Sequence, residues 1–98
     1  MARFGVYRLP DDSLVLDCQS DHVDHLGTRL VVPLLSPGDL PAALSSLHPC
    51  FDIDGKRLMM ATHLAGAVLS RLMKRPVTML HHQQDAIMRA LDILLTGF

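Results

Sequence analysis

Ninety-eight residues are enough for one domain with one modest hydrophobic core. Apolar residues make up 49% of the chain and charged residues 19%, a composition typical of a globular protein and too apolar for a disordered one. The net charge is −1, and Lys and Arg are scattered along the sequence, which disfavours a stand-alone nucleic-acid-binding domain.

Targeting and redox signals point to the cytoplasm. The N-terminal stretch MARFGVYRLP lacks the apolar core of a signal peptide, and no run approaches the roughly 20 apolar residues of a membrane span. Cys18 and Cys50 fit no C-x-x-C spacing, and Cys18 lies within an apolar alternation that is typical of a buried thiol. We therefore expect a cytoplasmic protein that does not enter the membrane.

The N-terminal part of the chain alternates with the period of a strand. In residues 3–9, Phe4 and Val6 fall on one face and Tyr7 and Leu9 on the other. The turn cluster PDDS follows, and residues 14–19 (LVLDCQ) alternate again, so the two segments are predicted to form a hairpin. Residues 20–28 are polar and are predicted to be a loop.

Two further strand regions follow. Residues 29–35 (RLVVPLL) are apolar and β-branched, and Pro33 predicts an edge or a bulge because it cannot donate a ladder hydrogen bond. Residues 36–49 are rich in turn formers; either Asp39 caps a short helical turn with Pro41 near its start, or the segment is a compact loop. Residues 50–62 predict a hairpin that turns at Asp54 and Gly55.

The C-terminal third contains one clear helix. For residues 63–76 the spacing slightly favours a helix, against Gly66 and Pro76. From Gln83 onward apolar residues recur at steps of three and four, and Gly97 stands where a helix-ending glycine belongs. Such a stripe is more often a core face than a binding face, but this one is wider than one packing face needs, so its remainder either meets another molecule or stays an exposed patch. Its members are Ile87, Ala90, Leu91, Leu94, Leu95 and Phe98.

Two chemical readings compete with protein binding. Six histidines, including His22 with His25 and His81 with His82, raise the possibility of a metal site, but the spacing is weak and we expect no metal and no cofactor. Arg29 together with His22 or His25 could supply the cation and the acid–base pair of a ribonuclease, although nothing in the spacing requires it.

Over nearly its full length the chain resembles the CcdB toxins of bacterial toxin–antitoxin modules. The resemblance is carried by four pieces in the same order and spacing: FGVYR at residues 4–8, DCQSDHVDHLGTRLVVPL at 17–34, HP followed by FDIDGKRLMMATH within 48–63, and a C-terminal helix that ends in GF. The resemblance implies a mainly β fold in residues 1–98, an SH3-like antiparallel barrel with a C-terminal helix, which forms a homodimer. It also implies that residues 63–76 are extended or loop-like.

The resemblance further implies function. Such toxins bind the A subunit of DNA gyrase, trap the cleaved-DNA complex and are neutralised by a CcdA-type antitoxin. Together toxin and antitoxin repress their own operon, so operator DNA is bound only by the toxin–antitoxin complex. These proteins are not enzymes, and no catalytic residue is expected.

The gyrase-binding residues carried over from the family lie in the last helix turn and in one loop. They are Asp92, Leu95, Thr96, Gly97 and Phe98, with His22 and Val23. Four of them differ from the family pattern: Thr96 replaces a Trp, Asp92 an Asn and His22 an Ile, and Phe98 is an apolar replacement for the terminal Ile. Two alternatives therefore remain, namely a dimeric interaction protein that has lost gyrase poisoning and a MazF-like barrel ribonuclease. Phe98 could also fold back as a helix-capping contact.

Overall fold

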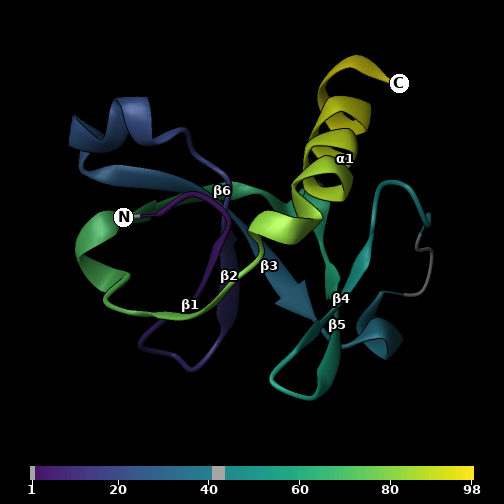
Figure 1. Cartoon of the computed structure of the whole chain (residues 1–98), viewed down its shortest axis with the longest axis horizontal. Helices are drawn as coiled ribbons and strands as arrows, with labels where there is room; N and C mark the ends of the chain where they lie inside the picture. The colour runs from purple at the N-terminus through teal and green to yellow at the C-terminus, as the bar shows by residue number, and fades with distance from the viewer. Residues whose placement is uncertain (1, 41–43) are drawn as a thin grey trace.

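The computed structural model describes residues 2–40 and 44–98, and it has seven strands and one α-helix there (Figure 1). The strands are β1 (Gly5–Arg8), β2 (Leu14–Asp17), β3 (Thr28–Leu35), β4 (Cys50–Ile53), β5 (Lys56–Met60), β6 (Gly66–Leu69) and β7 (Pro76–Met79). The helix is α1 (Gln84–Thr96), and short 3₁₀ turns are η1 (Asp21–Leu26), η2 (Pro37–Asp39), η3 (Thr62–Leu64), η4 (Ser70–Leu72) and η5 (His81–Gln83).

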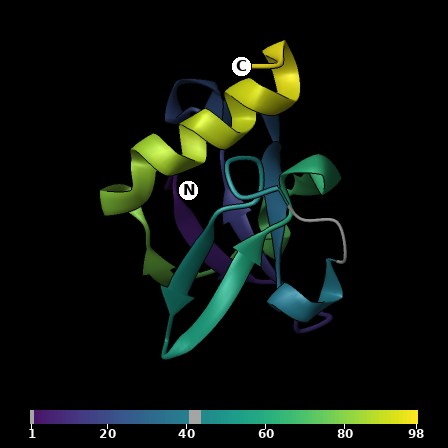
Figure 2. The ribbon, with the colours of Figure 1, turned by 90° about the vertical axis from the view of Figure 1, so that its right-hand side faces the viewer.

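The strands form one antiparallel sheet in the order β4-β5-β3-β2-β1-β7, with β6 also paired to β3. The long strand β3 lies at its centre: one side pairs with β2, and the other pairs first with β6 and then with β5. The sheet curls into a nearly closed barrel, and α1 lies across it (Figure 2). The predicted mainly β barrel with a C-terminal helix is confirmed.

Two hydrophobic clusters occupy the two faces of the first strands. Phe4 and Val6 belong to the main core, which also receives one face of α1. Tyr7 belongs to a smaller cluster with Val15, Val31 and Met73. The alternation predicted for residues 3–9 is therefore confirmed, because both sides of β1 are covered.

Both predicted hairpins are present. Strands β1 and β2 pair with Val6 opposite Leu16, and β4 and β5 pair with Ile53 opposite Lys56. The second turn consists of Asp54 and Gly55, whose φ angles of 54° and 80° are the positive values that a tight two-residue hairpin turn requires.

The helix weakly favoured for residues 63–76 by spacing is wrong. The segment contains strand β6 between the turns η3 and η4, as the family resemblance implied. Gly66 lies opposite Val31 and Val68 opposite Arg29, so hydrogen bonding to β3 overrides the helical periodicity. Strand β7 had no signal in the sequence reasoning.

Two local predictions need correction, and a third falls partly outside the described residues. Pro33 lies in the central strand β3 rather than at an edge. On one side of β3 it falls between the residues that pair with β6 and those that pair with β5, and there its carbonyl accepts a hydrogen bond from Ala61 N–H at 2.9 Å. The loop predicted for residues 20–28 contains the 3₁₀ turn η1. Asp39 is the last residue of η2, and the predicted turn that Asp39 would cap near Pro41 falls on residues 41–43, outside the described residues.

The helix predicted from Gln83 is confirmed as α1, with Ile87, Ala90 and Leu91 buried against the core. It begins after η5 and ends at Gly97, whose φ is 87° and whose N–H donates to the Ile93 carbonyl at 2.9 Å. No helix among residues 2–40 and 44–98 is long and apolar enough to cross a membrane.

Candidate functional site

The C-terminal end of α1 projects from the barrel and exposes apolar side chains. Leu95 is 75% exposed and Phe98 is 91% exposed, so Phe98 does not fold back as a capping contact. The Thr96 hydroxyl donates to the Asp92 carbonyl at 2.7 Å, which ties it to its own helix. Because Gly97 ends the helix in the left-handed conformation, Phe98 lies beyond the last turn and is accessible to a partner.

The second predicted element, η1, also exposes its side chains. Ser20 caps it by accepting from His22 N–H at 3.2 Å, and Gly27 ends it with a φ of 78°. The Val23 carbonyl accepts from Gln19 Nε2 at 3.1 Å. Val23 is 37% exposed, so part of this apolar side chain lies on the surface of the turn.

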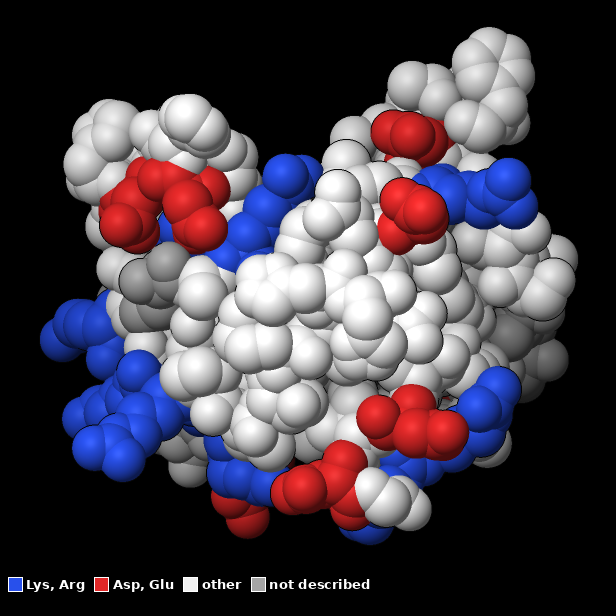
Figure 3. All heavy atoms as spheres, viewed as in Figure 1, with Lys and Arg blue, Asp and Glu red and all other residues white. Residues whose placement is uncertain are grey.

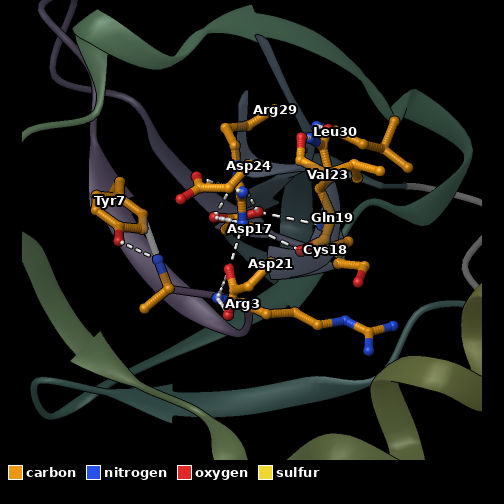
Figure 4. A network of polar contacts seen from close by, with 12 residues as sticks. Arg3, Tyr7, Asp17, Cys18, Gln19, Asp21, Val23, Asp24, Arg29 and Leu30 are labelled. Carbon is orange, nitrogen blue, oxygen red and sulfur yellow. Dashed lines mark hydrogen bonds and ion pairs between the residues drawn. The ribbon is translucent and has the colours of Figure 1, made fainter. Parts of the chain in front are cut away.

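A buried ion pair anchors η1 to the barrel (Figure 4). Arg29 on β3 and Asp17 on β2 have fully buried side chains, and their Nη2 and Oδ2 atoms are 2.7 Å apart. The same guanidinium contacts Asp21 at 3.0 Å and Asp24 at 3.3 Å, and both of these carboxylates belong to η1. One arginine therefore joins the start and the middle of the exposed turn to two core strands.

The surroundings of each carboxyl group determine its pKa. Burial raises the pKa of Asp17, while hydrogen bonds from Arg29 and the Gln19 backbone N–H oppose the rise. Burial also acts to raise the pKa of Asp21, but hydrogen bonds from Arg29 and the Arg3 backbone N–H bring it below its ordinary value. The network thus contains one buried carboxylate, Asp17, whose charge is compensated by Arg29, and partly exposed carboxylates that water can also solvate.

Both predicted site elements lie at the same end of the molecule, on separate projections. Figures 1 and 2 place η1 and the end of α1 at the top in both views. Figure 3 shows a hollow between the two projections. His22 and Val23 are therefore not in one continuous patch with Phe98, although both projections face the same direction.

Comparison with known families agrees with this architecture. Residues 3–97 match the family described as CcdB protein, which is all but three residues of the chain. The chain belongs to the CcdB family. Membership supports a role as the toxin of a toxin–antitoxin module.

The ribonuclease reading of Arg29 is wrong in the CcdB-like barrel. The Arg29 guanidinium is fully buried and bonded to three carboxylates and the Gln19 carbonyl, so it cannot approach a phosphate without breaking the network. His22 and His25 lie on the exposed turn. Among residues 2–40 and 44–98, no three His, Cys, Asp or Glu side chains gather in a way that would hold a metal ion.

Sequence reasoning missed two polar clusters. The Asp17–Arg29 pair is one, although Asp17 lies in the family-like DCQSD stretch that could have signalled it. The other is a histidine pair: His48 Nδ1 accepts from Leu44 N–H at 3.0 Å, so its Nε2 carries the proton and donates to His63 Nδ1 at 2.9 Å. Burial and the neighbouring His63 lower the pKa of His48.

The expected buried cysteine is confirmed. Cys18 lies in the main core, and burial raises the pKa of its thiol to about 12, which keeps it protonated and unreactive. Cys50 is partly buried on β4, and both cysteines are free thiols.

Proposed function

We propose that this chain is a gyrase poison that binds the A subunit of DNA gyrase and traps the enzyme on cleaved DNA. It acts in the cytoplasm as a homodimer without catalysis of its own, and a CcdA-type antitoxin neutralises it. The observation that carries the proposal is the exposure of the C-terminal helix end, where Phe98 is 91% and Leu95 75% accessible in a CcdB-family chain.

An accessible aromatic at this position suits a protein-binding site. An aromatic side chain buries ~150–250 Å² on contact, and apolar burial contributes ~25 cal/mol per Å², so one such anchor supplies several kcal/mol of binding free energy. Thr96, which replaces the family Trp, cannot supply that area. We therefore assign the anchoring role to Phe98, with Leu95, Gly97, Asp92, Val23 and His22 around it.

Dimer formation is supported by an exposed apolar surface on β3 and β6. Leu30 lies opposite Ala67 and Thr28 opposite Leu69, so Leu30 and Leu69 are diagonal neighbours on the sheet. Leu30 is 39% exposed and Leu69 43% exposed. Exposed apolar patches on small proteins mark interfaces, and a self-complementary patch generates a two-fold dimer that suits a two-fold partner such as the gyrase A dimer.

The experiment is a pull-down of purified gyrase A with the wild-type chain and two variants. Phe98→Ala removes the proposed anchor, and Leu44→Ala is the matched control because Leu44 is also a large apolar side chain, 63% exposed, on another loop. We expect Phe98→Ala to lose gyrase binding while its thermal unfolding is unchanged, and Leu44→Ala to bind as the wild type does. Equal binding by all three would refute the assignment.

The Thr96 departure favours one second candidate, a dimeric CcdB-like protein that binds an antitoxin but no longer poisons gyrase. Expression in hosts with sensitive and resistant gyrase A separates the two. Growth arrest that the resistant gyrase relieves supports poisoning, whereas normal growth of both hosts supports the interaction-only protein. Arrest in both hosts with fragmented mRNA would indicate a MazF-like nuclease and overturn both readings.

A further inference from the structure

Positive charge is concentrated in one part of the chain. Between Gly55 and Gln84 the sequence contains no Asp or Glu, and the ten acidic residues all lie outside this stretch. The same stretch holds five of the nine Lys and Arg residues, namely Lys56, Arg57, Arg71, Lys74 and Arg75. A net charge of −1 therefore conceals a strongly polarised distribution.

The fold gathers part of this charge around a pocket. Arg8 at the end of β1 and Lys74 and Arg75 before β7 line an open pocket of about 450 Å³, together with Leu9, Pro10 and Leu72. Arg71 lies next to Leu72 in η4. We call Arg8, Arg71, Lys74 and Arg75 the basic patch. Figure 3 shows Lys and Arg gathered at the lower left, where Figure 1 draws the segment that contains η4.

Most of this charge is not neutralised within the chain. All four side chains belong to exposed residues. Arg8 has a solvent-exposed contact to Asp12 at 3.7 Å, and among the described residues Arg71, Lys74 and Arg75 have no ion-pair partner. Neighbouring like charges repel one another, so an external polyanion that bridges them would be attracted to this surface.

We propose that the basic patch binds the phosphate backbone of duplex DNA. The residues that line the pocket include no aromatic ring, so the patch lacks the stacking surface that single-stranded nucleic acids use. Lys and Arg contact phosphates without reading sequence, while Leu9, Pro10 and Leu72 offer an apolar wall to the sugars. The choice of duplex DNA rests on the proposed function, which places the chain beside DNA held by gyrase and, with the antitoxin, on an operator.

The scattered appearance of Lys and Arg in the sequence is therefore misleading. Residue 8 is more than sixty positions from residues 71–75, and only the pairing of β1 with β7 brings the two segments together. Because the whole chain carries a net charge of −1, binding by the isolated protein should be weak and non-specific, with a Kd of about 10⁻⁴–10⁻⁶ M at physiological salt.

The test compares two triple variants of the full chain that change the net charge equally. The patch variant is Arg71→Gln, Lys74→Gln and Arg75→Gln; the control variant is Lys56→Gln, Arg57→Gln and Arg89→Gln, which removes three exposed cations elsewhere. Binding of a fluorescein-labelled 30-base-pair duplex is followed by anisotropy at several salt concentrations. A fluorescein-labelled poly-glutamate peptide is the second probe, and gyrase A pull-down is measured in parallel.

We expect the patch variant to bind DNA at least ten-fold more weakly at low salt. The slope of the logarithm of its binding constant against the logarithm of the salt concentration should fall in magnitude by about 2.7, or about 0.9 per lost phosphate contact. The control variant should keep a slope within about one unit of the wild type. Equal losses in the two variants, or no DNA binding by the wild type at low salt, would overturn the proposal. If the basic patch is needed to bind poly-glutamate and the wild type does not bind DNA, the proposal is overturned and an acidic protein is the better candidate for a partner.

Gyrase pull-down separates this inference from the proposed function. If the patch variant still binds gyrase A but no longer binds DNA, the two sites are independent and the inference stands. If the wild type binds DNA through the patch but does not bind gyrase A, the proposed function fails and the DNA site remains. All substituted side chains are exposed, so both variants should unfold at the wild-type temperature.

Discussion

Replacing Arg29 by methionine should remove a large part of the free energy of unfolding. In the native chain the Arg29 and Asp17 side chains are both fully buried, with a charged contact of 2.7 Å between them. Arg29→Met leaves the Asp17 carboxylate in the interior with a hydrogen bond from Gln19 N–H at 3.1 Å. Removing one partner of a buried pair costs ~3–5 kcal/mol. A domain of this size has ~5–15 kcal/mol in total.

The contacts of Arg29 with η1 should add little to that loss. Asp21 and Asp24 are each 53% exposed, and in the variant water can solvate their carboxylates. The double variant Asp17→Leu with Arg29→Met removes both buried charges, and replacing a buried pair by apolar groups is often close to neutral. We therefore expect the double variant to recover most of the stability that the single variant loses.

The assay is urea unfolding at pH 7 followed by far-UV circular dichroism, since the chain has no tryptophan and its one tyrosine is buried. Lowering the pH should reduce the difference in free energy of unfolding between Arg29→Met and the wild type, because protonation neutralises the Asp17 carboxylate that has lost its partner. A loss below ~1 kcal/mol in the single variant would refute the reasoning. So would a double variant as unstable as the single one.

Three further outcomes follow from local geometry. The pKa of His48 is lowered in the folded chain from its ordinary value of 6.5, so the unfolded chain binds the extra proton more readily. The stability contributed by neutral His48 should therefore be fully present above pH 6.5 and decrease as the pH falls below that value. His48→Gln should flatten that dependence in pH-resolved urea unfolding. Gly55→Ala forces a side chain into a φ of 80° and should lose ~1 kcal/mol by the same assay, whereas Gly38→Ala, at open space without positive φ, should be nearly neutral. Thr96→Trp restores an aromatic to the exposed helix end and should tighten gyrase A binding at least ten-fold in a titration; unchanged affinity would place the gyrase contact elsewhere.

Short-range patterns predicted the hairpins and the helix because their causes are local. Asp54 and Gly55 tolerate positive φ, and Gly97 ends α1, so the chain marks its own turns. Residues 63–76 gave the opposite result. Their spacing resembles a helix, but Gly66 and Val68 pair with β3, a partner more than thirty residues earlier in the chain. Pattern reasoning cannot see such pairing, and the family resemblance supplied it.

The candidate site was predicted in the same uneven way. Sequence resemblance named the residues of η1 and the helix end, yet the exposure of Phe98 depends on α1 running past the barrel, which only the folded chain reveals. The sequence allows Arg29 as a possible catalytic cation, because the sequence does not show whether a guanidinium is buried or exposed. Its burial against Asp17 reverses that interpretation.

The amino-acid order alone determined the class of this protein: the alternating strands, the two-residue turn, the amphipathic last helix and the family to which they belong. Tertiary structure decided which charges are buried inside the barrel and which gather on its surface. Arg29 is neutralised inside the barrel, whereas Arg8 joins Arg71, Lys74 and Arg75 on its surface. The physical reason is distance: strand and helix periods act over a few residues, whereas Coulomb interactions and burial depend on which remote segments the sheet brings together.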